Sequence, residues 1–167
     1  TPSTLASVSD STTPLGGIGA PNQGAGKGLL ANVIAIIGTG RPCAFWPQPT
    51  NEEEERKRLL AIGLQGDVIV CIDNVTRPFG SGTFANVITG LSYKDRILGH
   101  SENVEVPIRC VWLATGNNLS YVGDMVRRVV PIIIDPKIER PEERTGSPVS
   151  WANTARARPG ARGGRGT

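Results

Sequence analysis

A short glycine-rich segment of this chain carries the residue types that bind phosphate. It runs Pro21-Asn22-Gln23-Gly24-Ala25-Gly26-Lys27-Gly28, and an apolar run of helical composition follows it at once. Its glycines let backbone N–H groups turn inward toward an anion, and Lys27 adds a positive charge at the β- and γ-phosphates of a nucleotide. A helix that begins here directs its N-terminal dipole at the same group. The segment therefore predicts nucleotide binding by residues 22–28.

The segment departs from the usual phosphate-loop pattern at two places. The pattern G-x-x-x-x-G-K-[ST] has Gly where this chain has Pro21, and Ser or Thr where it has Gly28. Such a loop normally follows a buried strand that aims it. Residues 1–20 show no clear strand, because two adjacent glycines interrupt the only candidate, 15–18. We expect an irregular lead-in here, and the absence of an initial Met indicates a fragment or a start that is not the native one.

Polar residues that suit nucleoside triphosphate hydrolysis follow the loop in a sensible order. Hydrolysis needs an acid for Mg²⁺, a polar group that holds the attacking water, and a cation for charge that develops in the transition state. In doubly wound sheets such groups collect at the carboxyl ends of the strands. Each residue also suits a turn or a solvated surface. The candidates are Asp73 for the metal, Asn74 beside it, Asn117 and Asn118 for the γ-phosphate or the water, and Arg127 and Arg128 for the charge.

The hydrophobic pattern predicts an α/β fold with a parallel sheet. Continuous apolar runs of strand length are typical of strands buried on both faces, and strands that alternate with helices imply such a sheet. Thr50 or Asn51 caps a helix whose first turns carry three acid-to-base pairs four residues apart, which is typical of a solvated face. Pro131 favours an edge position or a bulge for the last strand. The predicted helices are 27–37, the acidic helix from 52 and 82–91, and the predicted strands are 42–46, 67–73, 108–115 and 129–134.

Composition restricts the classes of site and the compartment. His100 is the only histidine, which nearly excludes a histidine-based zinc site or catalytic triad. The three cysteines lie in or beside apolar runs without metal-type spacing, which favours buried, reduced thiols in a cytoplasmic protein. No apolar run is long enough to span a membrane. The cysteines are Cys43, Cys71 and Cys110.

The two ends of the chain differ in composition from its middle. Hydrophobic residues make up 38% of the chain, which is low for a compact domain, and the ends are where they are scarce. Four arginines and no acidic residue lie between Ser147 and the end. This stretch is either a disordered basic arm that contacts nucleic acid or an unstructured, non-native end. We therefore predict a lead-in at 1–20, one domain at 21–144 and a basic tail at 145–167.

Several segments together give the chain a family resemblance. They are GAGKGLLA, VIVCIDNV, DRILGHSENVEVP, WLATGNNL and GDMVRRVVPIIIDPKIERPEER. Over residues 22–144 they resemble the P-loop ATPase domain of phage and mobile-element replication proteins, a helicase-like module of the AAA+ and superfamily 3 group. The segments ATGNN and GD-x-x-RR, together with DP-x-x-ERPE-x-R, are more specific than the loop.

The resemblance implies a role for each candidate residue. Gly24, Gly26 and Lys27 belong to the Walker A loop, Asp73 to Walker B and Asn117 to sensor 1. Arg127 or Arg128 is the arginine finger or sensor that acts on a neighbouring subunit's nucleotide. ATP and Mg²⁺ are the implied ligands, DNA the implied partner, and a ring, commonly a hexamer, the implied assembly.

Two residues depart from the family pattern in ways that affect the chemistry. Gly28 lacks the hydroxyl that usually ligates Mg²⁺, so metal binding would depend on Asp73 and water. Asn74 stands where many members have a glutamate, and an amide orients water but is a poor base. Asp95 and Glu102 are further candidate bases, and Arg96 could contact phosphate, a neighbouring subunit or an ion-pair partner.

The sequence thus predicts a Mg²⁺-dependent ATPase module of a DNA replication helicase. One alternative is a non-catalytic nucleotide-binding or structural module with a degenerate loop, because Gly28, Asn74 and the weak lead-in all point that way. Another is a small-molecule phosphotransferase such as a kinase. ATGNN followed by paired arginines suits a ring ATPase better than a kinase, and the sequence has no acceptor-site signature.

Overall fold

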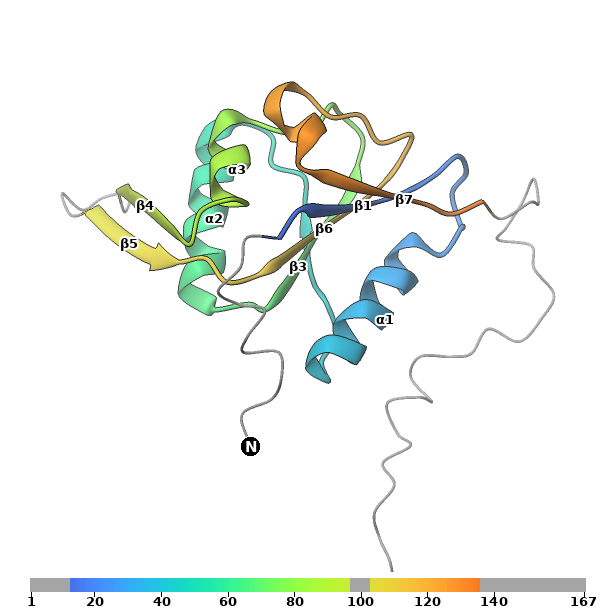
Figure 1. Cartoon of the computed structure of the whole chain (residues 1–167), viewed down its shortest axis with the longest axis horizontal. Coiled ribbons are helices and arrows are strands. Elements are labelled where there is room, and N and C mark those ends of the chain that lie inside the picture. The colour runs from blue at the N-terminus through green and yellow to red at the C-terminus, as the bar shows by residue number, and fades with distance from the viewer. Residues whose placement is uncertain (1–12, 97–102, 136–167) are drawn as a thin grey trace, which may run out of the picture.

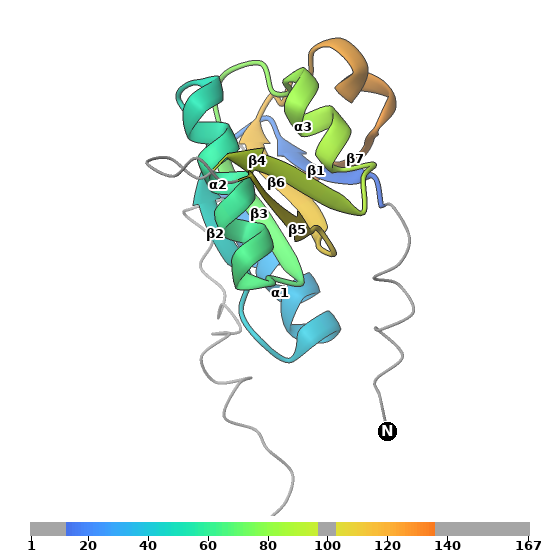
Figure 2. The ribbon, with the colours of Figure 1, turned by 90° about the vertical axis from the view of Figure 1, so that its left-hand side faces the viewer.

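The computed structural model describes residues 13–96 and 103–135. A parallel five-stranded sheet in the order β2-β3-β6-β1-β7 forms its centre (Figure 1). Helix α1 covers one face, and α2 and α3 cover the other, as both views show (Figure 2). The predicted α/β class with a parallel sheet is therefore confirmed. The sheet strands are β1 (Leu15–Ala20), β2 (Ala44–Pro47), β3 (Ile69–Val75), β6 (Val111–Asn117) and β7 (Val129–Ile133).

The remaining elements lie around this sheet. An antiparallel hairpin, β4 with β5, separates α3 from β6 in the chain, and the 3-10 helix η2 precedes β7. No helix in the described part of the chain has the length and apolar character that crossing a membrane requires. The predicted tail at 145–167 and most of the lead-in fall outside the described residues. The elements are α1 (Lys27–Thr39), α2 (Glu52–Gln65), α3 (Gly82–Val87), β4 (Ser92–Arg96), β5 (Asn103–Pro107) and η2 (Gly123–Arg127).

The prediction that no clear strand precedes the loop is wrong. Leu15–Ala20 form β1, which pairs in parallel with β6 on one side and β7 on the other. Its glycines, which hide the strand pattern in the sequence, are required by packing. A Cβ atom on Gly17 would lie 1.9 Å from the Tyr121 hydroxyl oxygen, and one on Gly16 would lie 2.8 Å from a Leu113 methyl group. Glycine inside a strand often marks such a close approach.

Helices α1 and α2 begin and end where local chemistry predicts. Asn51, not Thr50, is the N-cap of α2, and its side chain accepts a hydrogen bond from the Glu54 amide at 2.8 Å. Gly40 and Gly66 end the two helices in the left-handed conformation. Two of the three predicted acid-to-base pairs form on α2, Glu53 with Lys57 and Glu54 with Arg58.

The third pair is replaced by a contact with the hairpin that the sequence did not predict. Arg56 donates to both carboxylate oxygens of Asp95 on β4, at 2.7 and 2.9 Å, and Tyr93 donates to the same carboxylate at 2.6 Å. The hydrogen bonds from Arg56 hold the pKa of Asp95 well below its usual range. Asp95 thus anchors the hairpin to α2. Glu102, the other candidate base, lies outside the described residues.

Two other elements differ in length from their predicted spans. The predicted helix 82–91 ends as α3 at Val87, because residues 92–96 turn into the hairpin. Strand β6 starts at Val111 and extends through Asn117, so the predicted turn at 116–118 begins only at Asn118, whose φ is 50°. Pro131 lies in β7, an edge strand, as predicted.

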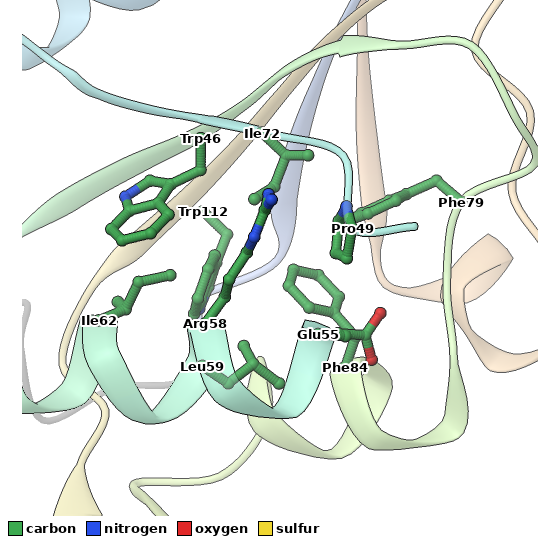
Figure 3. A pocket seen from close by; sticks show the side chains of 10 residues that line it. All are labelled: Trp46, Pro49, Glu55, Arg58, Leu59, Ile62, Ile72, Phe79, Phe84 and Trp112. Atoms are coloured by element: carbon green, nitrogen blue, oxygen red, sulfur yellow. The ribbon is translucent and has the colours of Figure 1, made fainter. Parts of the chain in front are cut away.

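The core has two parts, one on each face of the sheet. Between the sheet and α2 and α3, Phe84 packs edge-on against both Phe79 and Trp112, with ring centroids 4.9 and 5.0 Å apart. Glu55 and Arg58 from α2 flank these rings (Figure 3). The gap that they enclose is about 10 Å³, no more than one water needs, so this region is packed core. Under α1 the buried residues are Ile18, Ala31, Ala35, Cys43, Ile69, Cys71 and Leu113.

All three cysteines are free and buried, as the sequence predicts. None of them lies in a cluster of metal-ligating side chains, and the described part of the chain contains no group of three or more such side chains.

The contact between β1 and Tyr121 predicts that a destabilising substitution at Gly17 can be compensated by a second substitution at Tyr121. Gly17→Ala should lower the free energy of unfolding by about 2 kcal/mol, because the added methyl group overlaps the Tyr121 hydroxyl. Tyr121→Phe removes that hydroxyl, which is buried and has no hydrogen-bond partner in the described structure, so the double variant should recover at least half of the loss. Urea denaturation of the single and double variants measures this coupling. Gly82→Ala is the control, because a Cβ atom there meets nothing within 4 Å. If Gly17→Ala lowers the free energy of unfolding equally with and without the Tyr121→Phe substitution, the packing described here is contradicted.

The buried carboxyl of Glu55 predicts a pH-dependent stability. Burial raises the pKa of Glu55, and a hydrogen bond from the Ser81 hydroxyl opposes this shift. A raised pKa in the folded state means that the group's stabilising contribution is present at low pH and is lost as the pH rises through that pKa. Glu55→Gln should therefore stabilise the protein by about 1 kcal/mol at pH 7, and by less as the pH falls toward 4. Urea denaturation at both pH values checks this.

The control for this prediction is Glu52→Gln, which removes an exposed carboxylate from the same helical turn. It should lower stability slightly, because acids favour the start of a helix. A Glu55→Gln variant that is less stable than the parent at pH 7 would refute the prediction.

Candidate functional site

The loop, Asp73 and Asn117 lie at the same edge of the sheet. Ala20, the last residue of β1, pairs with Asn117, the last residue of β6. On the other side of β6, Ile72 of β3 pairs with Ala114, so Asp73 lies beside Thr115, two residues before the end of β6. The strands are parallel, and their carboxyl ends therefore bring together groups that lie up to 97 residues apart in the chain. This is the edge where ligands bind in sheets of this kind.

The loop between β1 and α1 has a backbone that only glycine adopts easily. Gly24 and Gly26 have φ angles of 70° and 86°, in the left-handed region. Gly26 is also the N-cap of α1, and no side chain caps that end of the helix. The first-turn N–H groups of a 13-residue helix are thus available to an anion. Of the other loop residues, Gln23 is exposed, and Asn22 and Ala25 are half-buried.

The side chain of Lys27 joins the loop to the end of β6. Its ammonium donates to the Asn117 side-chain oxygen at 2.7 Å and to the Asn22 carbonyl at 3.1 Å. Burial lowers the pKa of Lys27, and the negative charge of Asp73 opposes this effect. In the structure, Lys27 is thus hydrogen-bonded to Asn117 and lies close enough to Asp73 for the carboxylate to affect its pKa.

Asp73 is held by a residue that the sequence analysis did not single out. The Thr115 hydroxyl donates to one Asp73 carboxylate oxygen at 2.5 Å and accepts a hydrogen bond from the Asn74 amide at 3.1 Å. Thr115 is only 2% exposed. The signal in the sequence is a hydroxyl residue within the apolar run of β6. Asn74 itself has a φ of 53°, so the backbone of β3 is irregular at the residue after Asp73.

The two arginines lie apart from this cluster. Arg127 is in η2, its side chain is 79% exposed, and it pairs with Asp124 at 2.5 Å. Arg128 is only 26% exposed in its side chain and donates to the Ala85 carbonyl and the Thr89 hydroxyl, at 2.6 and 2.5 Å. No contact found among the described residues links either arginine to the loop. Arg128 fastens η2 to α3, whereas Arg127 faces solvent.

The residues present fit a Mg²⁺–nucleotide, except that the hydroxyl ligand usual in the first turn of the helix is missing. Mg²⁺ in such sites takes one or two carboxylates and completes its shell with phosphate oxygens and waters. Asp73 supplies a carboxylate, but Gly28 in the first turn of α1 supplies no side chain. A Cβ atom at Gly28 would meet nothing within 4 Å, so the backbone leaves room for one.

Comparison with known proteins agrees with this fold. No family model matches the sequence, and no curated protein matches it. The A-form apo structure of the C-terminal region of NrS-1 (305–718) is similar, with a TM-score of 0.52 and 16% sequence identity. The match covers 87% of this chain and 33% of that one, so this chain spans about a third of its length. At this identity the likeness is one of fold.

The open space at Gly28 predicts a gain of metal affinity. Gly28→Ser should lower the Mg²⁺ concentration for half-maximal metal-dependent ATP binding by roughly tenfold, because its hydroxyl adds a ligand of the type usual at this position. A Mg²⁺ titration of ATP binding measures this. Gly28→Ala is the matched control, since it brings the same gain in helix propensity without the oxygen. Equal effects of Ser and Ala would show that the hydroxyl does not reach the metal.

Proposed function

We propose that this chain binds ATP with Mg²⁺ and hydrolyses it, as the ATPase module of a DNA replication helicase of a phage or mobile element. The observation that carries the proposal is the hydrogen bond between Lys27 and Asn117 beside Asp73. It joins a loop of phosphate-binding geometry to the sheet edge where a carboxylate and an amide converge. The family resemblance of the sequence and the fold likeness to the NrS-1 region also support it.

Each residue has a task in this proposal. The first-turn N–H groups of α1 and the Lys27 ammonium bind the β- and γ-phosphates, which replace the oxygens of Asn117 and Asn22 as partners of the ammonium. Asp73 holds the metal, directly or through water. When bound, Mg²⁺ neutralises charge on the phosphate oxygens. Asn117, released from Lys27, and Asn74 orient the attacking water.

Arg127 is proposed as the cation that acts on a neighbouring subunit's nucleotide. Its exposed side chain is free to reach outward, because its ion-pair partner, Asp124, is itself 54% exposed in its side chain. Arg128 is the weaker candidate, since it is bonded to α3. A finger supplied in trans requires an assembly, and a ring, commonly a hexamer, that acts on DNA is the arrangement that the family resemblance implies.

A non-catalytic nucleotide-binding module is the second candidate function. Gly28 and Asn74 favour it, because the chain then lacks both a metal-ligating hydroxyl in α1 and a carboxylate beside Asp73. The two candidates differ in product. A binding module retains ATP, whereas an ATPase releases phosphate in a single turnover with Mg²⁺.

Paired binding and hydrolysis assays test the proposal. Lys27→Ala should weaken ATP binding at least tenfold, because it removes the charge at the phosphates. Arg127→Ala should leave ATP affinity within about twofold but abolish phosphate release, because the arginine acts only in the transition state. Isothermal titration with ATP and a single-turnover phosphate-release assay measure the two quantities.

Matched controls are Lys57→Ala on α2 and Arg41→Ala beyond the far end of α1, which should change neither quantity. Unchanged ATP affinity in Lys27→Ala would refute the loop assignment. Intact hydrolysis in both Arg127→Ala and Arg128→Ala would refute the arginine assignment. ATP binding without phosphate release in the parent protein would favour the binding module.

A further inference from the structure

The buried hydroxyl of Thr115 contacts Asp73 and Asn74 in the candidate site, but the proposed function gives it no role. It lies on β6, two residues before Asn117, and side chains two apart in a strand share a face. At 2% exposure it is one of two buried polar or charged residues in the described structure. The other, Glu55, lies in the aromatic core near α3 and Ser81. A buried hydroxyl needs partners, and those of Thr115 are both at the candidate site.

Both hydrogen bonds of Thr115 act at the point where β3 leaves its register with β6. Ile72 pairs with Ala114 and Val75 with Gly116, so three steps along β3 correspond to two along β6. Asp73 and Asn74 occupy this bulge. The Asn74 amide bonds to the Thr115 hydroxyl oxygen, a side-chain acceptor in place of a ladder carbonyl. Bulges often re-aim a side chain next to a functional site, and Asp73 lies within this one.

The two bonds fix the direction of the hydroxyl proton. The oxygen accepts from the Asn74 amide, so its proton points to the Asp73 carboxylate, where it donates at 2.5 Å. A carboxylate has about four lone-pair sites, and this bond uses one on Oδ1. The second oxygen remains for a metal ion. Because Gly28 supplies no ligand, the orientation of Asp73 has more influence on metal binding here than in a loop with a hydroxyl.

We propose that Thr115 is a positioning residue for metal binding, whose hydroxyl holds the Asp73 carboxylate and the Asn74 backbone of the β3 bulge in the orientation that nucleotide-bound Mg²⁺ requires. This inference rests on the proposed function. Groups that orient a metal-binding carboxylate typically change metal affinity by tenfold or more when they are removed.

The test separates metal binding from nucleotide binding. Mn²⁺ replaces Mg²⁺, and electron paramagnetic resonance measures free Mn²⁺ in a titration of the ATP complex. Thr115→Val, which keeps the shape but loses the hydroxyl, should weaken Mn²⁺ binding roughly tenfold. Its ATP affinity in EDTA should stay within about twofold of the parent. Thr115→Ser, which keeps the hydroxyl, should bind Mn²⁺ within about threefold of the parent.

Two outcomes overturn the inference while leaving the proposed function intact. One is parental Mn²⁺ affinity in Thr115→Val, and the other is an equal loss of ATP affinity in EDTA, which indicates a structural role only. If Thr115→Val does not fold, Thr115→Cys serves in its place, because a thiol is a weak donor, and the same comparison applies. A parent protein that binds ATP and Mn²⁺–ATP equally well, or binds neither, refutes the metal-dependent function itself and this inference with it.

Discussion

The pairing of β1 with β6 is the constraint on which the rest of this structure depends. It places Ala20, the last residue of β1, beside Asn117, the last residue of β6. The loop that follows β1 therefore begins next to Asn117. The approach is close because β1 carries almost no side chains on part of its length, and Tyr121 and Leu113 occupy the space that larger residues would take. A side chain at Gly16 would collide with Leu113 on β6, and one at Gly17 would collide with Tyr121. The glycines that weaken the strand signal are therefore required for β1 to pack in this position.

Burial then determines the electrostatics at this edge. Lys27 is partly desolvated beside Asp73, and its ammonium is bonded to two uncharged oxygens, those of Asn117 and Asn22. A cation in this position gains from any anion that replaces those oxygens, since an ionic hydrogen bond is stronger than a neutral one. The Asp73 carboxylate is likewise held by a neutral hydroxyl and not by a cation. In the described structure, neither charged group is therefore hydrogen-bonded to a group of opposite charge.

The other charged contacts act on the scaffold. Arg56 could have paired with Glu52 on its own helix, but it makes a two-pronged contact with Asp95, which bridges α2 and the hairpin. A fork-shaped guanidinium matches both oxygens of a carboxylate, and this contact also ties two elements together. Arg128 likewise binds α3, and its neighbour Arg127 remains at the surface. The two adjacent arginines, which the sequence does not distinguish, therefore have different surroundings in the structure.

The sequence by itself determined the class of fold, four of the five strands of the sheet and most candidate residues of the site. These follow from local patterns: apolar runs, caps and a polar residue at each strand end. Pro131 and the buried cysteines are where they were predicted, and of the two candidate caps of α2 the structure selects Asn51 over Thr50. Only the tertiary structure decided what depends on distant neighbours. It made 15–20 a strand, since β6 and β7 supply the pairing that glycines cannot signal. It shortened α3, built a hairpin around Asp95 and separated Arg128 from Arg127. It also joined Thr115 to Asp73 across the bulge, because a hydroxyl's partner is set by the register of two strands and not by its place in the chain.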